Sequence, residues 1–509
     1  MAKCAWRCVI GTVPLLLLMG WVAIIFGTSM AEATASSKSK SYQAPGKLIA
    51  SLVVSRHGDR SPQMNAPAYA AGDRRTFLNK FPIDTSKWPV DYGQLTPLGM
   101  KQAYHLGSFL RSRYVEGASN NRILDDRYDH VETHARSTDV DRTIVTAMAI
   151  LNGLYPHGTG PKDGVPGRLE LIPVHTVTYK LDALLDGSAS AHCPKFKKHG
   201  QTAINEPFMT NVLQENEPLI RALPALTGVS VAQVDTMEPG DLIKLITAVR
   251  DVRVCQRAHD VSQPSNVTRF DKAVEEVTNA FMIAKWNNTG LGYLVGGRLL
   301  RGISRRLSVV RELDMGADYV VERLHLECNE KGNDSDESGY CPRRFVLMVG
   351  HDTTILDLRA ALGMDITVEG IVPYMSHLVF ELRQDGRNYN VQVLSGDCTR
   401  PTTPEGGAFC PARNSSCRLD EFMAFVEHTV PKDIDTACKV MRDGTGDFIP
   451  FGQAPPQSQP AANSKLTLLS WVQLVGVGAL NAVIGVGAAL TVYILLNRRA
   501  RADGYAPIA

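Results

Sequence analysis

A run of apolar residues that ends abruptly in charged ones opens the first recognisable element of the chain. Residues 48–54 are almost wholly apolar, which is typical of a strand buried on both faces, as in a parallel sheet covered by helices. Arg56, His57 and Arg60 follow around Gly58. Guanidinium groups bind phosphate oxygens in pairs, and a glycine leaves room for an oxyanion beside the backbone. The pattern predicts an anion-binding turn at the carboxyl end of this strand.

A second apolar run, residues 345–349, ends in Gly350, His351 and Asp352 and leads into a helix that begins near Thr353. It repeats the arrangement of the first run. A parallel sheet would bring the two polar endings to the same edge.

Between these two runs, residues 128–146 read as a strand that leads into a helix capped near Thr138. Arg136 then stands at the amino end of that helix, where free N–H groups and the helix dipole favour anions. We therefore expect Arg136 to bind phosphate. Arg142 lies inside the predicted helix and is interpreted as structural.

The remaining periodicity completes the fold. Thr96 and Pro97 begin an amphipathic helix that runs to Tyr114, and residues 177–290 change from strands to helical stretches. We predict an α/β fold whose mostly parallel central sheet is flanked by helices and carries an inserted helical cap at about 177–290.

Both ends of the chain carry long apolar segments. Residues 1–35 have the pattern of a signal peptide, with cleavage near Ala33 or Ala35; an uncleaved signal anchor is the alternative. After a linker at 444–465, residues 466–496 are 31 uncharged residues, more than the roughly 20 that span a bilayer. Arg498 and Arg499 follow at once, so the positive-inside rule places the tail, 497–509, in the cytoplasm. The sequence predicts a type I membrane protein with a single C-terminal transmembrane helix.

Composition narrows the functional classes. The formal net charge of +2 gives no reason to expect nucleic acid as a partner. Of ten cysteines, eight lie between Cys193 and Cys438, an even number that favours disulfides. N-glycosylation sequons also indicate lumenal or extracellular folding; they lie at Asn266, Asn287, Asn333 and Asn414.

His130, Glu132 and His134 would share one face of a strand and are candidates for a metal site. No further imidazole or cysteine lies nearby in sequence, and a short spacing match is weak evidence. The three residues are interpreted as polar lining near the pocket. We expect no metal and no cofactor.

Three motifs occur in order: RHGDRSP from Arg56, RSTDVDRT from Arg136 and GHDTT from Gly350. Together they resemble the histidine acid phosphatase family of the histidine phosphatase superfamily, in its membrane-bound acid phosphatase type, over residues 47–443. The resemblance implies hydrolysis of phosphomonoesters at acidic pH through a covalent phosphohistidine. It implies two catalytic and four phosphate-binding residues: His57 as nucleophile, Asp352 as an acid that starts protonated, and Arg56, Arg60, Arg136 and His351 as the phosphate ligands.

Two alternatives to this reading stay open. One is a narrower phosphatase for a lysophospholipid or an inositol phosphate, and the other is a catalytically idle membrane glycoprotein. The complete set of motif residues speaks against the idle protein.

The resemblance also implies disulfides. It matches Cys193 with Cys438 and Cys410 with Cys417. Cys328 and Cys341 flank one loop and are expected to pair. Cys255 and Cys398 remain as the last pair, although the family's partner strand has Ser376 where a cysteine is expected.

The C-terminal tail contains Tyr505, Ala506, Pro507 and Ile508, which resemble a tyrosine-based sorting signal read by adaptors. An endosomal or lysosomal membrane is therefore expected, with the catalytic domain in the lumen; the cell surface is the alternative. A homodimer is left open.

Overall fold

The computed structural model describes residues 46–63, 88–189, 191–259, 265–286, 291–316, 343–366 and 372–439. The predicted signal peptide, linker, membrane span and tail lie outside these ranges, as does the expected pair Cys328 and Cys341. No helix within the described ranges is long and apolar enough to cross a membrane.

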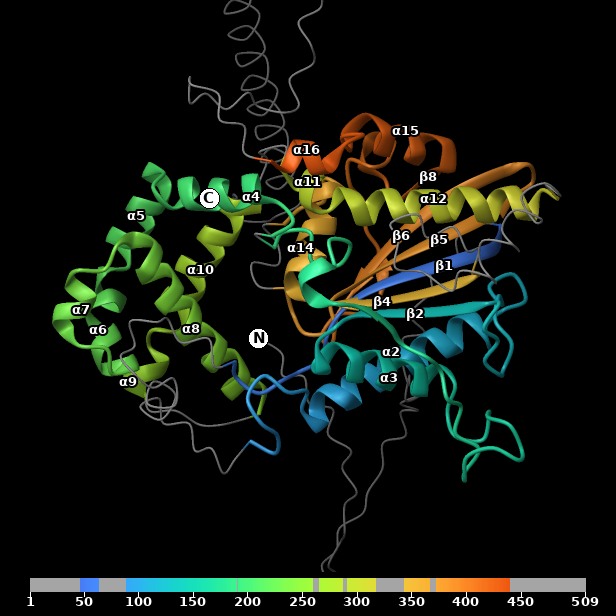
Figure 1. The fold of residues 1–509 in the computed structure, drawn as a ribbon, viewed down its shortest axis with the longest axis horizontal. Helices are drawn as coiled ribbons and strands as arrows, with labels where there is room; N and C mark the ends of the chain where they lie inside the picture. The colour runs from blue at the N-terminus through green and yellow to red at the C-terminus, as the bar shows by residue number, and fades with distance from the viewer. Residues whose placement is uncertain are drawn as a thin grey trace, which may run out of the picture. The chain divides into compact units, whose positions relative to one another are not determined.

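Within the described ranges, eight strands form one sheet in the order β3-β2-β4-β1-β5-β6-β7, with β8 paired to β6 (Figure 1). Their bounds are β1 (Lys47–Arg56), β2 (Thr133–Thr138), β3 (His175–Val177), β4 (Phe345–Gly350), β5 (His377–Asp385), β6 (Asn388–Gly396), β7 (Thr403–Pro404) and β8 (Ser416–Arg418).

The prediction of a mostly parallel sheet is correct for one half and wrong for the other. Strands β3, β2, β4 and β1 are parallel. From β1 onward every pairing is antiparallel. For β5 and β6 the reason is their connection, where Asp385 pairs with Asn388 across a tight turn that contains Gly386 at φ 59°. Strands joined by so short a turn must run in opposite directions.

Helices cover both faces of the sheet. On one face lie α2 (Pro97–Tyr114) and α3 (Asp141–Leu154); the other face is covered by α11 (Gly292–Val295), α12 (Gly297–Asp314), α14 (Asp352–Ala361), α15 (Leu419–Thr429) and α16 (Ile434–Cys438). In β1, Val53 packs into the first layer, whereas Leu52 and Val54 pack into the second. The expected burial of this strand on both faces is confirmed.

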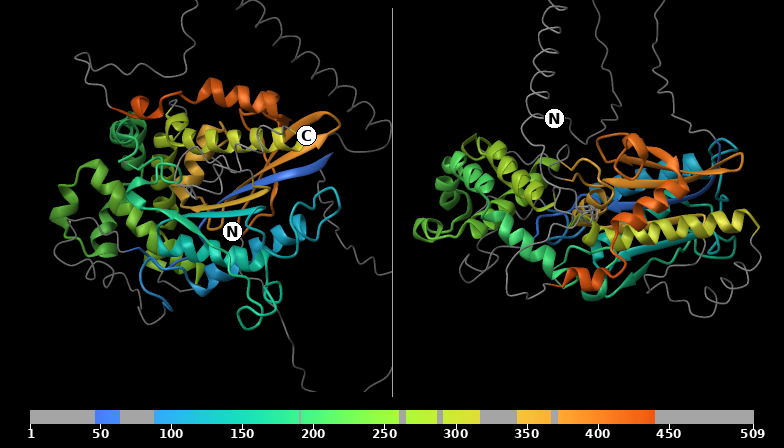
Figure 2. Two further views of the ribbon diagram at one scale, coloured as in Figure 1. Left: turned by 45° about the vertical axis from the view of Figure 1, so that its right-hand side comes forward. Right: turned by 90° about the horizontal axis from the view of Figure 1, so that it is seen from above.

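A group of helices forms the cap beside the sheet (Figure 2). Its members are α4 (Pro194–Ile204), α5 (Pro207–Glu215), α6 (Glu217–Thr227), α7 (Val231–Asp235), α8 (Pro239–Ala258), α9 (Ser265–Thr268) and α10 (Asp271–Trp286). They have an apolar core of their own, which includes Leu223, Ile246 and Val277. All of them fall within the range that the sequence predicts for the cap. Short 3-10 helices complete the fold, η2 (Tyr179–Leu181) and η3 (Pro411–Arg413).

Two of the expected disulfides are confirmed, Cys193–Cys438 and Cys410–Cys417. The pairing of Cys255 with Cys398 is wrong, because Cys255 is a free thiol buried at the end of α8. Its sulfur lies 3.5 Å from the Tyr374 hydroxyl and 3.9 Å from Nη1 of Arg60.

Of the predicted N-glycosylation sites, Asn414, at the end of η3, is exposed.

Candidate active site

The two polar strand endings meet because β1 and β4 are adjacent parallel strands. Their register aligns Arg56 with Gly350, and the backbone N–H of His57 donates to the Gly350 carbonyl at 3.0 Å. His57 and His351 therefore begin at the same edge of the sheet. Their rings lie 5.7 Å apart between centroids and are inclined by 72°.

Gly58 is required by packing within the protein. A Cβ atom on Gly58 would come within 2.5 Å of the Gly99 carbonyl oxygen in the first turn of α2. The glycine thus allows the loop after β1 to press against that helix. Beyond it, Asp59 is buried and accepts hydrogen bonds from Thr96 Oγ1 at 2.5 Å and from His259 Nε2 at 2.6 Å. These contacts fix the loop from which His57 and Arg60 project.

His57 is buried and its tautomer is determined by one contact. Nδ1 lies 2.8 Å from the Gly58 carbonyl oxygen. A carbonyl can only accept, so Nδ1 carries the hydrogen and the neutral ring keeps its lone pair on Nε2. Burial, followed by the charges of Arg56 and Arg142, holds the pKa of His57 well below its ordinary value. The ring therefore stays neutral to a lower pH than an ordinary histidine does.

His351 is also neutral. Arg142 Nη2 donates to its Nδ1 at 3.2 Å, which leaves the hydrogen on Nε2 to be donated to Thr138 Oγ1 at 3.1 Å. Burial, followed by the charge of Arg142, lowers the pKa of His351 to about 3.

Two guanidinium groups come from the end of β1 and the loop that follows it, Arg56 from the last residue of the strand and Arg60 from the loop. Arg56 donates to the Val372 carbonyl, lies 4.4 Å above the Tyr374 ring and places Nη2 3.3 Å from Asp352 Oδ2. Arg60 donates from Nη2 to Asp251 Oδ1 of α8 at 2.7 Å. Both side chains are buried, so their positive charges act at short range with little screening by water.

Asp352 is the first residue of α14, and its carboxylate accepts from the Thr353 N–H at 2.9 Å. Burial alone raises the pKa of this carboxyl, but the charges of Arg56, His351 and Arg60 outweigh burial and bring the pKa down to about 2. The expectation that Asp352 starts protonated is therefore wrong for the ligand-free protein.

The structure places two arginines differently from the expectation. Arg136 lies in β2 and donates from Nη2 to Asp182 Oδ1 at 2.7 Å, a contact in which both residues are buried. Arg142, interpreted as structural, lies beside His57 and His351 in the cavity. The reason is that β2 extends to Thr138 and α3 begins only at Asp141, so Arg142 occupies the first helical turn. Burial and the charge of Arg60 lower its pKa to about 10.

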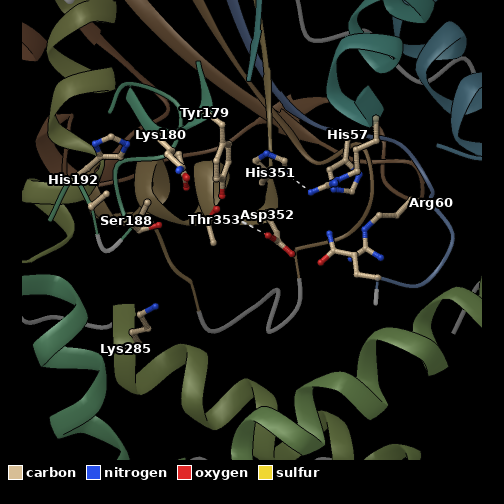
Figure 3. A pocket seen from close by; sticks show the side chains of 15 residues that line it. His57, Arg60, Tyr179, Lys180, Ser188, His192, Lys285, His351, Asp352 and Thr353 are labelled. Carbon is tan, nitrogen blue, oxygen red and sulfur yellow. Dashed lines mark hydrogen bonds between the residues drawn. The ribbon is translucent and has the colours of Figure 1, made fainter. Parts of the chain in front are cut away.

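A cavity of about 490 Å³, hereafter cavity 1, is lined by His57, Arg60, Arg142, His351 and Asp352 among others (Figure 3). Figure 3 shows His57 and Arg60 on one side, His351 and Asp352 in the middle, and Tyr179 and Lys180 on the other side. Six of the charged or imidazole groups named by the sequence motifs are thus gathered in one place: His57, His351, Asp352, Arg56, Arg60 and Arg142.

The weighed metal residues do not converge. His134 stacks on His175 with 4.9 Å between ring centroids, and Glu132 pairs with Arg344 at 3.5 Å. Within the described ranges, no group of three or more histidine, cysteine or acidic side chains is placed to share a metal ion.

Comparison with known proteins agrees with this geometry. The family model of the histidine phosphatase superfamily (branch 2) matches residues 47–395. The chain is 30% identical to prostatic acid phosphatase of Bos taurus over 407 residues, which is 78% of this chain and 89% of the relative. It is 27% identical to human lysosomal acid phosphatase over 392 residues, 76% of this chain and 78% of the relative.

Among solved structures, the apo form of Hafnia alvei phytase superposes with a TM-score of 0.53 at 17% identity. It covers 78% of this chain and 100% of the phytase. At this identity the likeness concerns the fold alone.

Proposed function

The chain belongs to branch 2 of the histidine phosphatase superfamily, and from that premise we propose that it is an acid phosphatase that hydrolyses phosphomonoesters through a phosphohistidine. The observation that supports this most directly is the neutral His57, whose free Nε2 lies among three arginines. Such a nitrogen is a nucleophile at acidic pH, where an ordinary histidine is protonated.

Phosphate binding falls to Arg56, Arg60, Arg142 and His351 in this proposal. Three guanidinium groups offer donors to the equatorial oxygens of the phosphoryl group. The Nε2–H of His351 joins them when it turns from Thr138 Oγ1, to which it donates in the ligand-free protein. Arg142 takes the place that the motif suggested for Arg136, whose guanidinium is already bound to Asp182. Preorganised positive charge of this kind is the main protein contribution to phosphoryl transfer.

The first chemical step forms a bond between His57 Nε2 and phosphorus and breaks the bond between phosphorus and the ester oxygen. The departing oxygen takes a proton from Asp352. In the second step a water molecule gives a proton to the Asp352 carboxylate and attacks phosphorus, the bond to Nε2 breaks, and inorganic phosphate leaves.

The proton on Asp352 needs a source, because its pKa of about 2 leaves the carboxyl ionised in the free protein. A phosphomonoester has a second pKa of about 6, so below that pH it binds as a monoanion that carries a proton. Transfer of this proton to Asp352 readies the acid. Acidic pH is then needed to keep the substrate in its monoanionic form, and not to protonate Asp352 in the free protein.

The compartment follows from the same proposal. A relative of this chain is a lysosomal acid phosphatase, and an acidic lumen suits a reaction that needs the monoanion. We place the catalytic domain in the lumen of endosomes or lysosomes, with residues 466–496 as the membrane span and Tyr505 as a sorting signal for adaptors.

The test is phosphate release from a panel of phosphomonoesters between pH 3 and 9, by the parent protein and by His57→Ala. We expect release below about pH 6 by the parent and none by the variant. Release that survives in His57→Ala, or none by the parent on any ester, would contradict the proposal.

A further inference from the structure

A second cavity of about 440 Å³, hereafter cavity 2, meets cavity 1 at Arg60, Gln63 and Asp352. It lies between the reaction centre and the cap, because one wall comes mainly from α8 and the other includes Arg56, Arg60 and Asp352. The proposed mechanism leaves this space without an occupant.

The in-line geometry of phosphoryl transfer identifies the occupant. The attacking and leaving oxygen or nitrogen atoms lie on opposite sides of phosphorus. Asp352, the proposed proton donor to the leaving oxygen, lines both cavities, whereas His57 lines cavity 1 and not cavity 2. A leaving group that departs away from His57 and beside Asp352 therefore moves towards cavity 2.

Apolar atoms make up most of the wall surface of cavity 2, although charged residues also line it: Arg56, Arg60, Lys244, Arg250, Asp251 and Asp352. Ile204, Ile243, Ala248, Val254 and Phe281 contribute to the apolar surface. A polyhydroxylated or polyphosphorylated leaving group would lose hydrogen bonds to water against these side chains, whereas an alkyl group would gain from burial. The exposed Thr247 stands at the same wall.

One cation in cavity 2 has no part in the phosphate site. Arg250 of α8 lines the cavity, its Nε is buried, and no described residue accepts from that Nε. Arg250 is also near enough to Asp352 to help lower the pKa of that carboxyl. A buried guanidinium N–H without an acceptor is costly. A ligand oxygen close to the ester bond would satisfy it.

We infer that cavity 2 is the leaving-group subsite, and that it takes phosphomonoesters of apolar alcohols that carry an acceptor oxygen, such as an ester carbonyl, for Arg250. The inference rests on the proposed phosphatase function and names its substrate class. Thr247 and Arg250 are then specificity residues of the cap.

The test compares kcat/KM of the full-length protein for three esters of primary alcohols: glycerol 1-phosphate, heptyl phosphate and 2-(butanoyloxy)ethyl phosphate. The last two have chains of equal length, and only the second carries a carbonyl. We expect heptyl phosphate to exceed glycerol 1-phosphate by about tenfold or more, as apolar pockets discriminate by such factors. We expect the carbonyl to add a further factor of about ten, the effect of one hydrogen bond to a charged group.

Two variants separate the two parts of the inference. Thr247→Asp brings a carboxylate to the apolar wall and should bring the heptyl to glycerol ratio near one, whereas Thr247→Val should keep it. Arg250→Gln should remove the carbonyl advantage and keep the heptyl to glycerol ratio. Arg257→Gln, the matched change on the exposed side of the same helix, should keep both ratios.

A parent protein that hydrolyses heptyl and glycerol phosphates with equal efficiency would overturn the subsite and leave the phosphatase function standing. A carbonyl advantage that is absent, or that survives Arg250→Gln, would overturn the assignment of Arg250. If none of the three esters is hydrolysed, the proposed function itself fails.

Discussion

Arg60, in the loop after β1, donates a hydrogen bond to Asp251 of the cap helix α8, with 2.7 Å between Nη2 and Oδ1. The second carboxylate oxygen of Asp251 accepts from the backbone N–H of Gln63 at 2.8 Å. Burial lowers the pKa of Arg60, but Asp251 outweighs burial and raises that pKa well above its ordinary value. The cap therefore holds one of the proposed phosphate-binding groups in position.

Replacement of Asp251 should weaken phosphate binding through Arg60. We expect Asp251→Ala to lower kcat/KM and to raise the inhibition constant for inorganic phosphate by about 10- to 100-fold, the effect of losing a charge-assisted hydrogen bond. Asp251→Asn retains an acceptor oxygen, so its kcat/KM and inhibition constant should lie between those of the parent and of Asp251→Ala. Glu275→Ala, which removes an exposed ion pair with Arg257, is the control. An unchanged inhibition constant in Asp251→Ala would contradict the positioning role.

Replacement of Arg142 should impair catalysis, whereas replacement of Arg136 should impair stability. Arg142→Met removes a donor from the phosphate site and should lower kcat/KM by about 10² to 10³ with little loss of stability. Arg136→Met leaves buried Asp182 without its partner and should lower the free energy of unfolding by about 3–5 kcal/mol. Steady-state kinetics and urea denaturation measure the two effects. The assignment is wrong if Arg136→Met loses turnover at full stability while Arg142→Met keeps turnover.

Anion binding should bring a proton to Asp352. The charges that hold its pKa at about 2 are partly neutralised by a bound dianion, so the pKa rises. Sulfate, which carries no proton itself at pH 4–5, should therefore bind with uptake of up to one proton. Calorimetry in buffers of different ionisation enthalpy measures this uptake, and Asp352→Asn should reduce it. Equal uptake by the parent and Asp352→Asn would exclude this carboxyl as the site.

Asp357 should make stability depend on pH. Its carboxylate accepts from Trp286 Nε1 at 2.8 Å and from the Ser188 N–H at 3.0 Å, beside Lys285, yet burial raises its pKa to about 7. The unfolded chain binds this proton only below about pH 4. Between pH 4 and 7 the folded protein therefore holds the proton more tightly, and the free energy of unfolding falls as pH rises.

The always neutral Asp357→Asn lacks this dependence. The difference in unfolding free energy between the parent and Asp357→Asn should therefore change by a few kcal/mol from pH 4 to 7, in the direction that favours the parent at low pH. Asp397 is the control, because its pKa is lowered by hydrogen bonds from Thr399 and Arg400 against the effect of burial. For Asp397→Asn the difference should stay constant over this range and change only below it. A constant difference for Asp357→Asn would show that its pKa is not raised.

The sequence predicts the two catalytic strands well, because each is an apolar run that ends in a short polar motif. Strand β1 and strand β4 begin and end within a few residues of the predicted bounds. Arg142 was missed because the start of α3 was predicted too early. Beginning the helix at Asp141 would have placed Arg142 in the first turn, where an anion ligand is expected.

Contacts between distant segments could not be predicted. Arg113 of α2 forms a 2.6 Å ion pair with Glu381, which is fully buried in β5. The hydrogen bond from Arg60 to Asp251 likewise joins the loop after β1 to the cap. Both depend on packing between residues far apart in sequence, which periodicity along one segment does not report.

The central claim is that His57 carries the phosphoryl group. The direct test mixes the parent protein with ³²P-labelled phosphomonoester and stops the reaction rapidly without acid. Peptide mapping then locates the label. The account predicts one labelled peptide that contains His57, with a label that is stable in alkali and lost in acid. The label should be absent from His57→Ala. It should be longer-lived in Asp352→Asn when the ester has a good leaving group. A label on a serine, an aspartate or another histidine, or turnover by His57→Ala at the parent's rate, would contradict the account.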